Sequence, residues 1–260
     1  MSSVPHKLDC KDYKSWLDSE SATRLLSLQS SWLQHKIAEF SGSHLMYHGL
    51  SREAEFLHAS FIKHCFRMGL PWQQGIIQAD AWMSSGEWPL PDCELDAVIM
   101  QHSLDFTRRP HQMIREAART VKPNGYLVII GFNPFSLWGG TQKLMPFSST
   151  MPWVANTVSA NRLKDWLKLL DFTVLSHETM GHISPLTFLP RRLCHRVDSV
   201  LAGSPMMMGN CYILVAQKTV AGMTSIRNRH WLMAERQFGW AHSMPHKQLL
   251  KEQPNKIRKF

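Results

Sequence analysis

The stretch 89–136 constrains the fold of this chain more than any other part of the sequence. Two short, almost uniformly apolar runs, 95–100 and 126–132, flank a segment in which apolar residues recur at helical spacing: Met113, Ile114, Ala117, Ala118 and Val121. Apolar runs of this length are typical of strands covered on both faces, whereas the spacing between them indicates an amphipathic helix. The stretch therefore predicts a strand, a helix and a second strand.

The ends of this helix are also marked in the sequence. Pro110 suits the first helical turn, where its missing N–H is no loss, and the triplet 123–125, Pro-Asn-Gly, is expected to end the helix and turn the chain into the next strand. Two strands joined through a helix run parallel, with a right-handed crossover.

Similar patterns outside this stretch predict helices at 19–40 and 159–170, and strands at 44–49, 75–80, 172–175 and 210–220. The run 61–66 could form another strand, and 191–201 is expected to be helical. Strands that alternate with helices and end in two closely spaced strands predict an α/β fold. Its sheet is expected to be mostly parallel with an antiparallel last strand and to carry helices on both faces.

Composition indicates a soluble globular protein of one domain with extensions, since 44% of the 260 residues are hydrophobic. The first 16 residues have no apolar core of signal-peptide length, and no run approaches the roughly 18 apolar residues of a membrane span. Five scattered cysteines without a CxxC pair suggest free thiols. We therefore expect a cytoplasmic protein.

The positive charge is concentrated in the segment 218–260, which has nine Lys and Arg against Glu235 and Glu252, so that it carries +7 of the net +9. Trp231 and Trp240 lie among these cations, and cations with indoles are the groups that contact phosphates and stack on bases. The alternatives are a disordered solubilising extension, a contact with another subunit, and binding to a membrane surface.

The segment 79–136 resembles the downstream half of class I S-adenosylmethionine-dependent methyltransferases, particularly the type 11 branch. The resemblance rests on LPDCELDAV at 90–98, QH at 101–102, REAARTVKPNGYLVI at 115–129 and NPFS at 133–136. It continues through RLKDWLKLLDF at 162–172 and covers about residues 41–217. It implies a Rossmann-like methyltransferase domain at 41–217, a helical extension at 1–40 and a basic, disordered tail at 218–260.

The resemblance also implies which residues bind S-adenosylmethionine. Asp80 and the backbone of Ala81 would contact the adenine, while Gln101, with His102 beside it, would face the methionine end from the tip of the fourth strand. Ligands of such sheets bind outside the carboxyl ends of the strands. The alternatives are that Asp80 caps a turn, that Gln101 is a solvated strand tip, and that His102 is a hydrogen-bonded loop residue rather than a general base.

Two further residues, Asn133 and Pro134, would line the substrate pocket in a methyltransferase, or would simply form a turn after the fifth strand. No metal site is expected. His44 and His48 lie on one face of a predicted strand, but four residues apart they are roughly 13 Å from each other.

The first half of the sequence departs from the methyltransferase pattern. The family has a glycine-rich loop after its first strand, and here the segment 47–53, YHGLSRE, retains only Gly49, with Tyr47 in the position of an acid. Only 31 residues separate Gly49 from Asp80, which is short for two crossovers, so one helix is expected to be missing or very short. No carboxylate near Arg67 matches the family's ribose ligand.

Two functions follow from these observations. The first is S-adenosylmethionine-dependent methyl transfer to a small molecule or RNA, with a reduced cofactor site. The second is a non-catalytic, methyltransferase-like module that binds a partner, with nucleic acid as the candidate partner of its basic tail.

Overall fold

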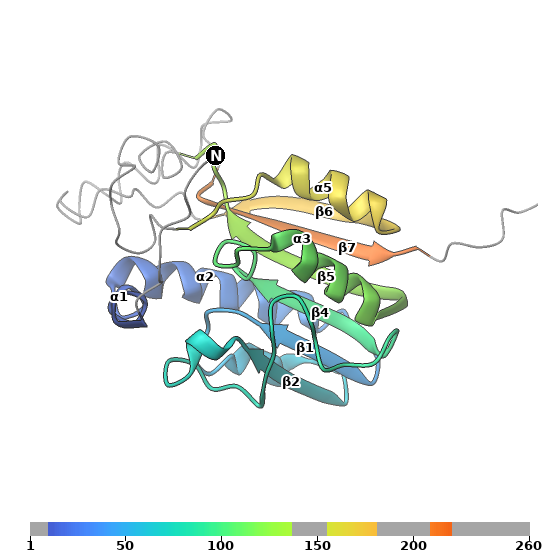
Figure 1. Cartoon of the computed structure of the whole chain (residues 1–260), viewed down its shortest axis with the longest axis horizontal. Helices are drawn as coiled ribbons and strands as arrows, with labels where there is room; N and C mark the ends of the chain where they lie inside the picture. Colours follow the sequence, from blue (N-terminus) through green and yellow to red (C-terminus); the bar gives the residue numbers. More distant parts are fainter. Residues whose placement is uncertain (1–9, 137–154, 181–208, 220–260) are drawn as a thin grey trace, which may run out of the picture. The chain divides into compact units, whose positions relative to one another are not determined.

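A computed structural model of the chain describes residues 10–136, 155–180 and 209–219 (Figure 1). The chain divides into two units, 1–220 and 221–260, and the second lies wholly outside the described residues. The predicted helix at 191–201 and almost all of the basic tail also lie outside them. The domain boundaries at 40 and 217 remain predictions.

Seven strands of the described residues form one sheet, in the order β3-β2-β1-β4-β5-β7-β6. β7 runs antiparallel to both of its neighbours, and the other pairings are parallel. The strands are β1 (His44–His48), β2 (His64–Gly69), β3 (Ala81–Trp82), β4 (Leu95–Gln101), β5 (Val121–Phe132), β6 (Phe172–Met180) and β7 (Cys211–Lys218). The predicted α/β fold, mostly parallel with an antiparallel last strand, is therefore confirmed.

The helices lie on both faces of this sheet, as predicted. They are α1 (Cys10–Leu17), α2 (Glu20–Ile37), α3 (Pro110–Thr120) and α5 (Ala160–Leu169), with the short 3-10 helices η1 (Glu55–Ala59) and η2 (Pro71–Gln73). Side chains of β4 alternate between the faces: Val98 packs with α3 and α5, whereas Ile99 packs with α2. Figure 1 shows α3 and α5 together over one face and α2 along the other.

The central unit of β4, α3 and β5 confirms the strand, helix, strand prediction, with one correction. Pro110 is the first residue of α3, but the helix ends at Thr120, and Val121 already begins β5. The helix therefore ends before the predicted stop at 123–125, but Asn124 has a φ of +63° and the pairing of β5 with β4 shifts register there, so these residues do turn the chain into the regular part of the strand. Val121 is already extended (φ −72°, ψ 132°), and Pro123 then disfavours the helical region for Lys122, the residue before it.

Both crossovers between β1 and β3 are reduced to single 3-10 turns, η1 and η2, which confirms that a helix is missing here. The strand predicted at 75–80 is wrong, because β3 consists only of Ala81 and Trp82. Gly75 has a φ of +75°, which a strand does not contain, and Gln78 donates its backbone N–H to Arg52 at 3.1 Å. Ile77 is nonetheless buried, so this apolar side chain packs against the protein from a loop rather than from a strand.

The N-cap of α2 is Ser19, whose hydroxyl oxygen accepts the backbone N–H of Ala22 at 3.2 Å. We expect Ser19→Ala to lower the free energy of unfolding by about 1 kcal/mol, because this N–H then loses its partner. Urea denaturation would measure the loss. Ser27→Ala, on the exposed side of the same helix, is the control and should not destabilise the protein. Equal losses in both variants would show that the cap is not responsible.

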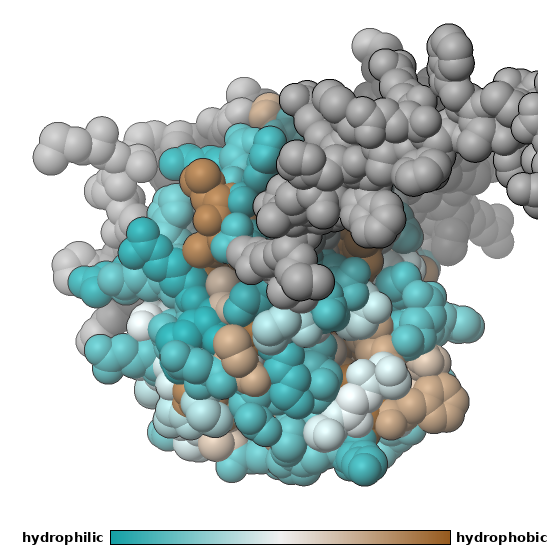
Figure 2. Space-filling model, turned by 90° about the vertical axis from the view of Figure 1, so that its right-hand side faces the viewer, coloured by the Kyte–Doolittle hydropathy of each residue, from teal (hydrophilic) through white to brown (hydrophobic). Residues whose placement is uncertain are grey.

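The end of the molecule at which the parallel strands begin is mostly hydrophilic, with small, scattered hydrophobic patches (Figure 2). Within the described residues, no helix is both long enough and apolar enough to cross a bilayer. The same residues contain no group of three or more His, Cys, Asp or Glu side chains arranged to hold a metal ion.

Candidate functional site

The candidate site lies at the end of the sheet where β1, β2, β4 and β5 finish, which we call the carboxyl edge. The loop after β1 begins with Gly49, as predicted, and is tightly enclosed. A Cβ atom added to Gly49 would lie 2.5 Å from the hydroxyl of Tyr47 and 2.6 Å from Cβ of Gln101. This glycine is therefore required by the chain's own side chains, which occupy the space beside it.

A chain of buried hydrogen bonds runs along the carboxyl edge from Tyr47 to Asp105. The Tyr47 hydroxyl donates to Oε1 of Gln101 at 2.5 Å, and Nε2 of Gln101 donates to Oε1 of Gln29 at 2.7 Å. Nε2 of Gln29 lies 2.9 Å from Nε2 of His102, and Nδ1 of His102 lies 2.9 Å from Oδ2 of Asp105. All five side chains are at most 2% exposed. We call these five residues the buried polar chain.

The directions within the buried polar chain determine the tautomer of His102. Because Oε1 of Gln29 accepts from Gln101, its Nε2 must donate, so Nε2 of His102 is an acceptor. The proton of the imidazole is then on Nδ1 and is donated to Asp105. Asp105 accepts a second bond from the backbone N–H of Phe132 at 3.0 Å. These bonds fix the orientation of the His102 ring. Its unprotonated atom, Nε2, accepts a hydrogen bond from Gln29 of α2.

Burial dominates the electrostatics of this region. Burial raises the pKa of the Asp105 carboxyl, although its bonds to His102 and Phe132 oppose the rise. The thiol of Cys211 lies 4.0 Å from Nε2 of His102, and burial, together with the nearby Asp105, raises its pKa well above the ordinary value. This thiol is therefore protonated at neutral pH and is not an activated nucleophile.

Asp80 and Ala81 are both exposed, and Asp80 lies beside Arg67 of β2 rather than beside the buried polar chain. Its Oδ2 accepts the backbone N–H of Arg67 at 2.7 Å, and its Oδ1 lies 3.4 Å from the guanidinium. Desolvation alone would raise the pKa of Asp80, but the bonds from Arg67 outweigh it and lower the pKa. Asp80 is ionised, and it precedes β3 instead of following the third strand as predicted.

Asn133 and Pro134 follow β5 directly, and Asn133 forms a closed turn there. Its side-chain amide donates to the carbonyl of Gly209 at 3.1 Å, and its Oδ1 accepts the backbone N–H of Phe135 at 3.0 Å. Asn133 is 6% exposed, so its polar atoms serve this turn in the structure. A substrate contact by Asn133 or Pro134 remains a prediction.

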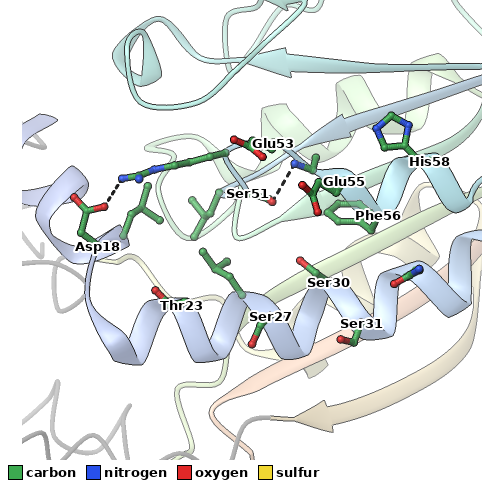
Figure 3. Close-up of a pocket in the computed structure, with 16 residues that line it drawn as sticks. Asp18, Thr23, Ser27, Ser30, Ser31, Ser51, Glu53, Glu55, Phe56 and His58 are labelled. Atoms are coloured by element: carbon green, nitrogen blue, oxygen red, sulfur yellow. Dashed lines mark hydrogen bonds and ion pairs between the residues drawn. The ribbon is translucent and has the colours of Figure 1, made fainter.

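An open groove of about 980 Å³ lies beside the carboxyl edge, between α2 and the loop that leads from β1 into η1. Figure 3 shows Thr23 and Ser30 of α2 on one wall of the groove and Glu53 and Glu55 on the opposite wall. Asp18 and Arg52 close one end through an ion pair at 2.7 Å. The short η1 leaves this space where a full crossover helix would otherwise pack.

The sequence comparisons identify the region that carries these features. Residues 57–129, which include β2, β3, β4, α3 and most of β5, match the sequence model of the type 11 methyltransferase family, described as "Methyltransferase domain". This match covers the middle of the chain, and residues 57–129 are similar to a type 11 methyltransferase domain. The predicted family is therefore confirmed for the half of the fold in which the sequence carries the family's motifs.

One known sequence and several solved structures are also similar to this chain. "Uncharacterized protein YafS" of Escherichia coli K12 is 39% identical over 98 residues, which are 37% of this chain and only 40% of that protein. A SAM-dependent methyltransferase from Archaeoglobus fulgidus superimposes with a TM-score of 0.55 at 19% identity, over 74% of this chain and 94% of the other. One from Thermotoga maritima gives 0.54 at 15% identity, over 81% and 100%. At these identities the structures show the class I methyltransferase fold.

S-adenosylmethionine does not fit the carboxyl edge in the arrangement that the structure describes. The methionine end would need the space beside Gly49, which Tyr47 and Gln101 fill, and Gln101 and His102 have no exposed surface. The side chain of Tyr13, from α1, is also fully buried over this edge. Of the residues predicted to contact the cofactor, only Asp80 and Ala81 are exposed.

Sequence reasoning missed three members of the buried polar chain, although each left a signal. Gln29 is a polar residue on the apolar stripe of α2, between Leu25 and Leu33. Asp105 follows His102 by three residues, a spacing that suits a paired side chain. Tyr47 stands where the family has an acid, but the sequence does not show that its ring turns back toward Gln101.

Proposed function

We propose that this chain is an S-adenosylmethionine-dependent methyltransferase with a reduced cofactor site, acting on a small molecule or on RNA, and that its methionine subsite opens before the cofactor binds. The observation that supports this most is the pair of His102 and Asp105 at the tip of β4, beside the edge where ligands bind in such sheets. A type 11 methyltransferase domain and the class I strand order provide the setting.

In this proposal the chain's own side chains prepare a proton acceptor. Asp105 holds the proton of His102 on Nδ1, which leaves Nε2 free to accept a proton from a methyl acceptor once the amide of Gln29 has moved away. The cofactor supplies an electrophilic methyl group when bound. The exposed carboxylate of Asp80 would bind its adenosine part, and Arg67 keeps that carboxylate ionised.

Calorimetric titration with S-adenosylmethionine and S-adenosylhomocysteine tests the proposal. We expect both ligands to bind. Asp80→Ala removes the carboxylate that would contact the adenosine part and should weaken binding by about tenfold or more, which corresponds to a loss of roughly 1.4 kcal/mol of binding free energy. Glu39→Ala removes another exposed carboxylate in an ion pair, with Lys36, and should leave the affinity unchanged. Absence of binding at millimolar ligand would contradict the proposal, whereas binding unaffected by Asp80→Ala would contradict only the placement of the adenine side.

The second candidate, a non-catalytic methyltransferase-like module, is favoured by a specific observation. Every side chain of the buried polar chain already has hydrogen-bond partners within the protein. The polar groups of the proposed methionine subsite therefore need no ligand to satisfy them. Such a module would bind its partner elsewhere, with the basic tail as the candidate contact for nucleic acid or for another subunit. Failure of both ligands to bind in the titration would favour this function.

A further inference from the structure

We propose that α1 is an intramolecular plug, whose aromatic side chains occupy the carboxyl edge in place of an aromatic base and which a nucleoside ligand must displace. This inference rests on the proposed function and deepens it, because it adds a regulatory contact at the same site. The plug consists of Tyr13, Trp16 and Leu17, which are 0%, 9% and 6% exposed.

The plug reaches the ends of three parallel strands at once. The ring of Tyr13 lies 4.9 Å from that of Trp72, just after β2, and 5.9 Å from that of Phe106, just after β4, both edge to face. The ring of Trp16 lies 6.4 Å from that of Phe132, the last residue of β5. In Figure 1, α1 lies at the end of the sheet toward which these strands run. This is where ligands bind in open α/β sheets.

The surfaces beneath the plug would suit the base of a nucleoside. Trp72, Phe106 and Phe132 are aromatic, and aromatic rings stack on a planar base as readily as they pack against Tyr13 and Trp16. Displacement of the plug would therefore exchange one set of aromatic contacts for another. The ligand class that this predicts is a nucleoside with an exposed aromatic base, such as S-adenosylhomocysteine.

Several features allow α1 to leave while α2 stays in place. α1 has only eight residues, and isolated helices of that length are marginal in water, so it depends on its packing. Ser19, which follows it, has extended backbone (φ −71°, ψ 148°) and caps α2 independently. α2 is anchored on the sheet by the fully buried Leu33 and Ile37. The hinge is therefore between Asp18 and Ser19.

An exposed ion pair fastens this hinge to the loop after β1. Asp18 and Arg52 are in contact at 2.7 Å, and their side chains are 55% and 43% exposed. Figure 3 shows the pair bridging from the end of α1 to the loop after β1, across one end of the groove. Exposed ion pairs contribute little free energy, so the pair of Asp18 and Arg52 can separate at low cost.

The affinity for S-adenosylhomocysteine tests the plug. Trp16→Ala should bind this ligand about tenfold more tightly than the wild type, because the apparent dissociation constant falls as the fraction of open protein rises. Phe40→Ala, the matched control, removes a buried ring that stacks on Tyr126 at 4.5 Å, away from the carboxyl edge, and should bind as the wild type does. Binding by Trp16→Ala that is no tighter than wild-type binding would overturn the plug and leave the proposed function standing.

Two further measurements keep the proposal testable if Trp16→Ala does not fold or if no variant binds the ligand. Asp18→Arg should tighten binding by about twofold and the double swap with Arg52→Asp should restore the wild-type value, as expected for an exposed pair. In the wild type without ligand, amides of α1 should exchange at least about tenfold faster than those of α2, since local opening precedes global unfolding. Equal exchange in the two helices would overturn the plug, whatever the ligand does.

Discussion

Replacing Asp105 with alanine is expected to lower the free energy of unfolding by roughly 2–6 kcal/mol, since each buried donor left without a partner costs about 1–3 kcal/mol. The carboxylate is buried and accepts from both Nδ1 of His102 and the backbone N–H of Phe132, so the substitution leaves two buried donors without a partner. Urea or thermal denaturation of the purified protein would measure the loss.

Asp105→Asn is the matched control for this substitution. Both donors bind the same atom, Oδ2, and an asparagine can place its single oxygen there, while Oδ1 has no hydrogen-bond partner in the structure. We therefore expect Asp105→Asn to cost much less, about 1–2 kcal/mol. Equal losses in the two variants would show that the negative charge, rather than the acceptor oxygen, stabilises this part of the fold.

His48 is expected to make the protein less stable in mild acid. It is fully buried in β1, with Nδ1 2.7 Å from the carbonyl of Met68, and burial lowers its pKa from 6.5 to about 4. Between these two values the unfolded chain binds a proton that the folded protein does not. The contribution of His48 to stability is therefore complete above pH 6.5 and falls by about 3 kcal/mol as the pH drops to 4.

Denaturation midpoints at several pH values between 7.5 and 4 would measure this effect. His48→Gln should remove most of the pH dependence, because its amide can donate to Met68 without titrating. The exposed His58→Gln serves as the control and should keep the wild-type dependence. If His48→Gln instead loses stability with acid as steeply as the wild type, other groups are responsible.

The sequence predicts the fold best where burial alone determines the structure. In β4 and β5 most residues of the apolar runs are buried, against α2 on one face and α3 and α5 on the other, so composition and spacing are sufficient. The loop at 75–80 shows the limit of this reasoning. Ile77 is buried there too, but Gly75 and the bond from Gln78 to Arg52 determine its backbone, and such contacts are not local in sequence.

The candidate site was predicted only in part, for a similar reason. Gln101 and His102 lie at the tip of β4 as expected, beside Gly49, and their side chains are brought together. Their partner Gln29 is 72 residues from Gln101 in the sequence, in a helix expected to be an extension of the domain. No local pattern shows that this helix reaches into the edge of the sheet, and that contact decides whether the site is open or filled.

The position of β7 has a consequence for the synthesis of the chain. β7 lies between β5 and β6, yet 78 residues separate the end of β5 from its start. At the usual rate of roughly 5–20 residues per second, the ribosome leaves the edge of β5 unpaired for about 4–16 seconds. That edge carries Leu127, Val128, Ile129 and Ile130, and unpaired apolar edges associate with other chains. The nascent protein is therefore most prone to aggregation in this interval, which makes it the stage at which a chaperone would protect it.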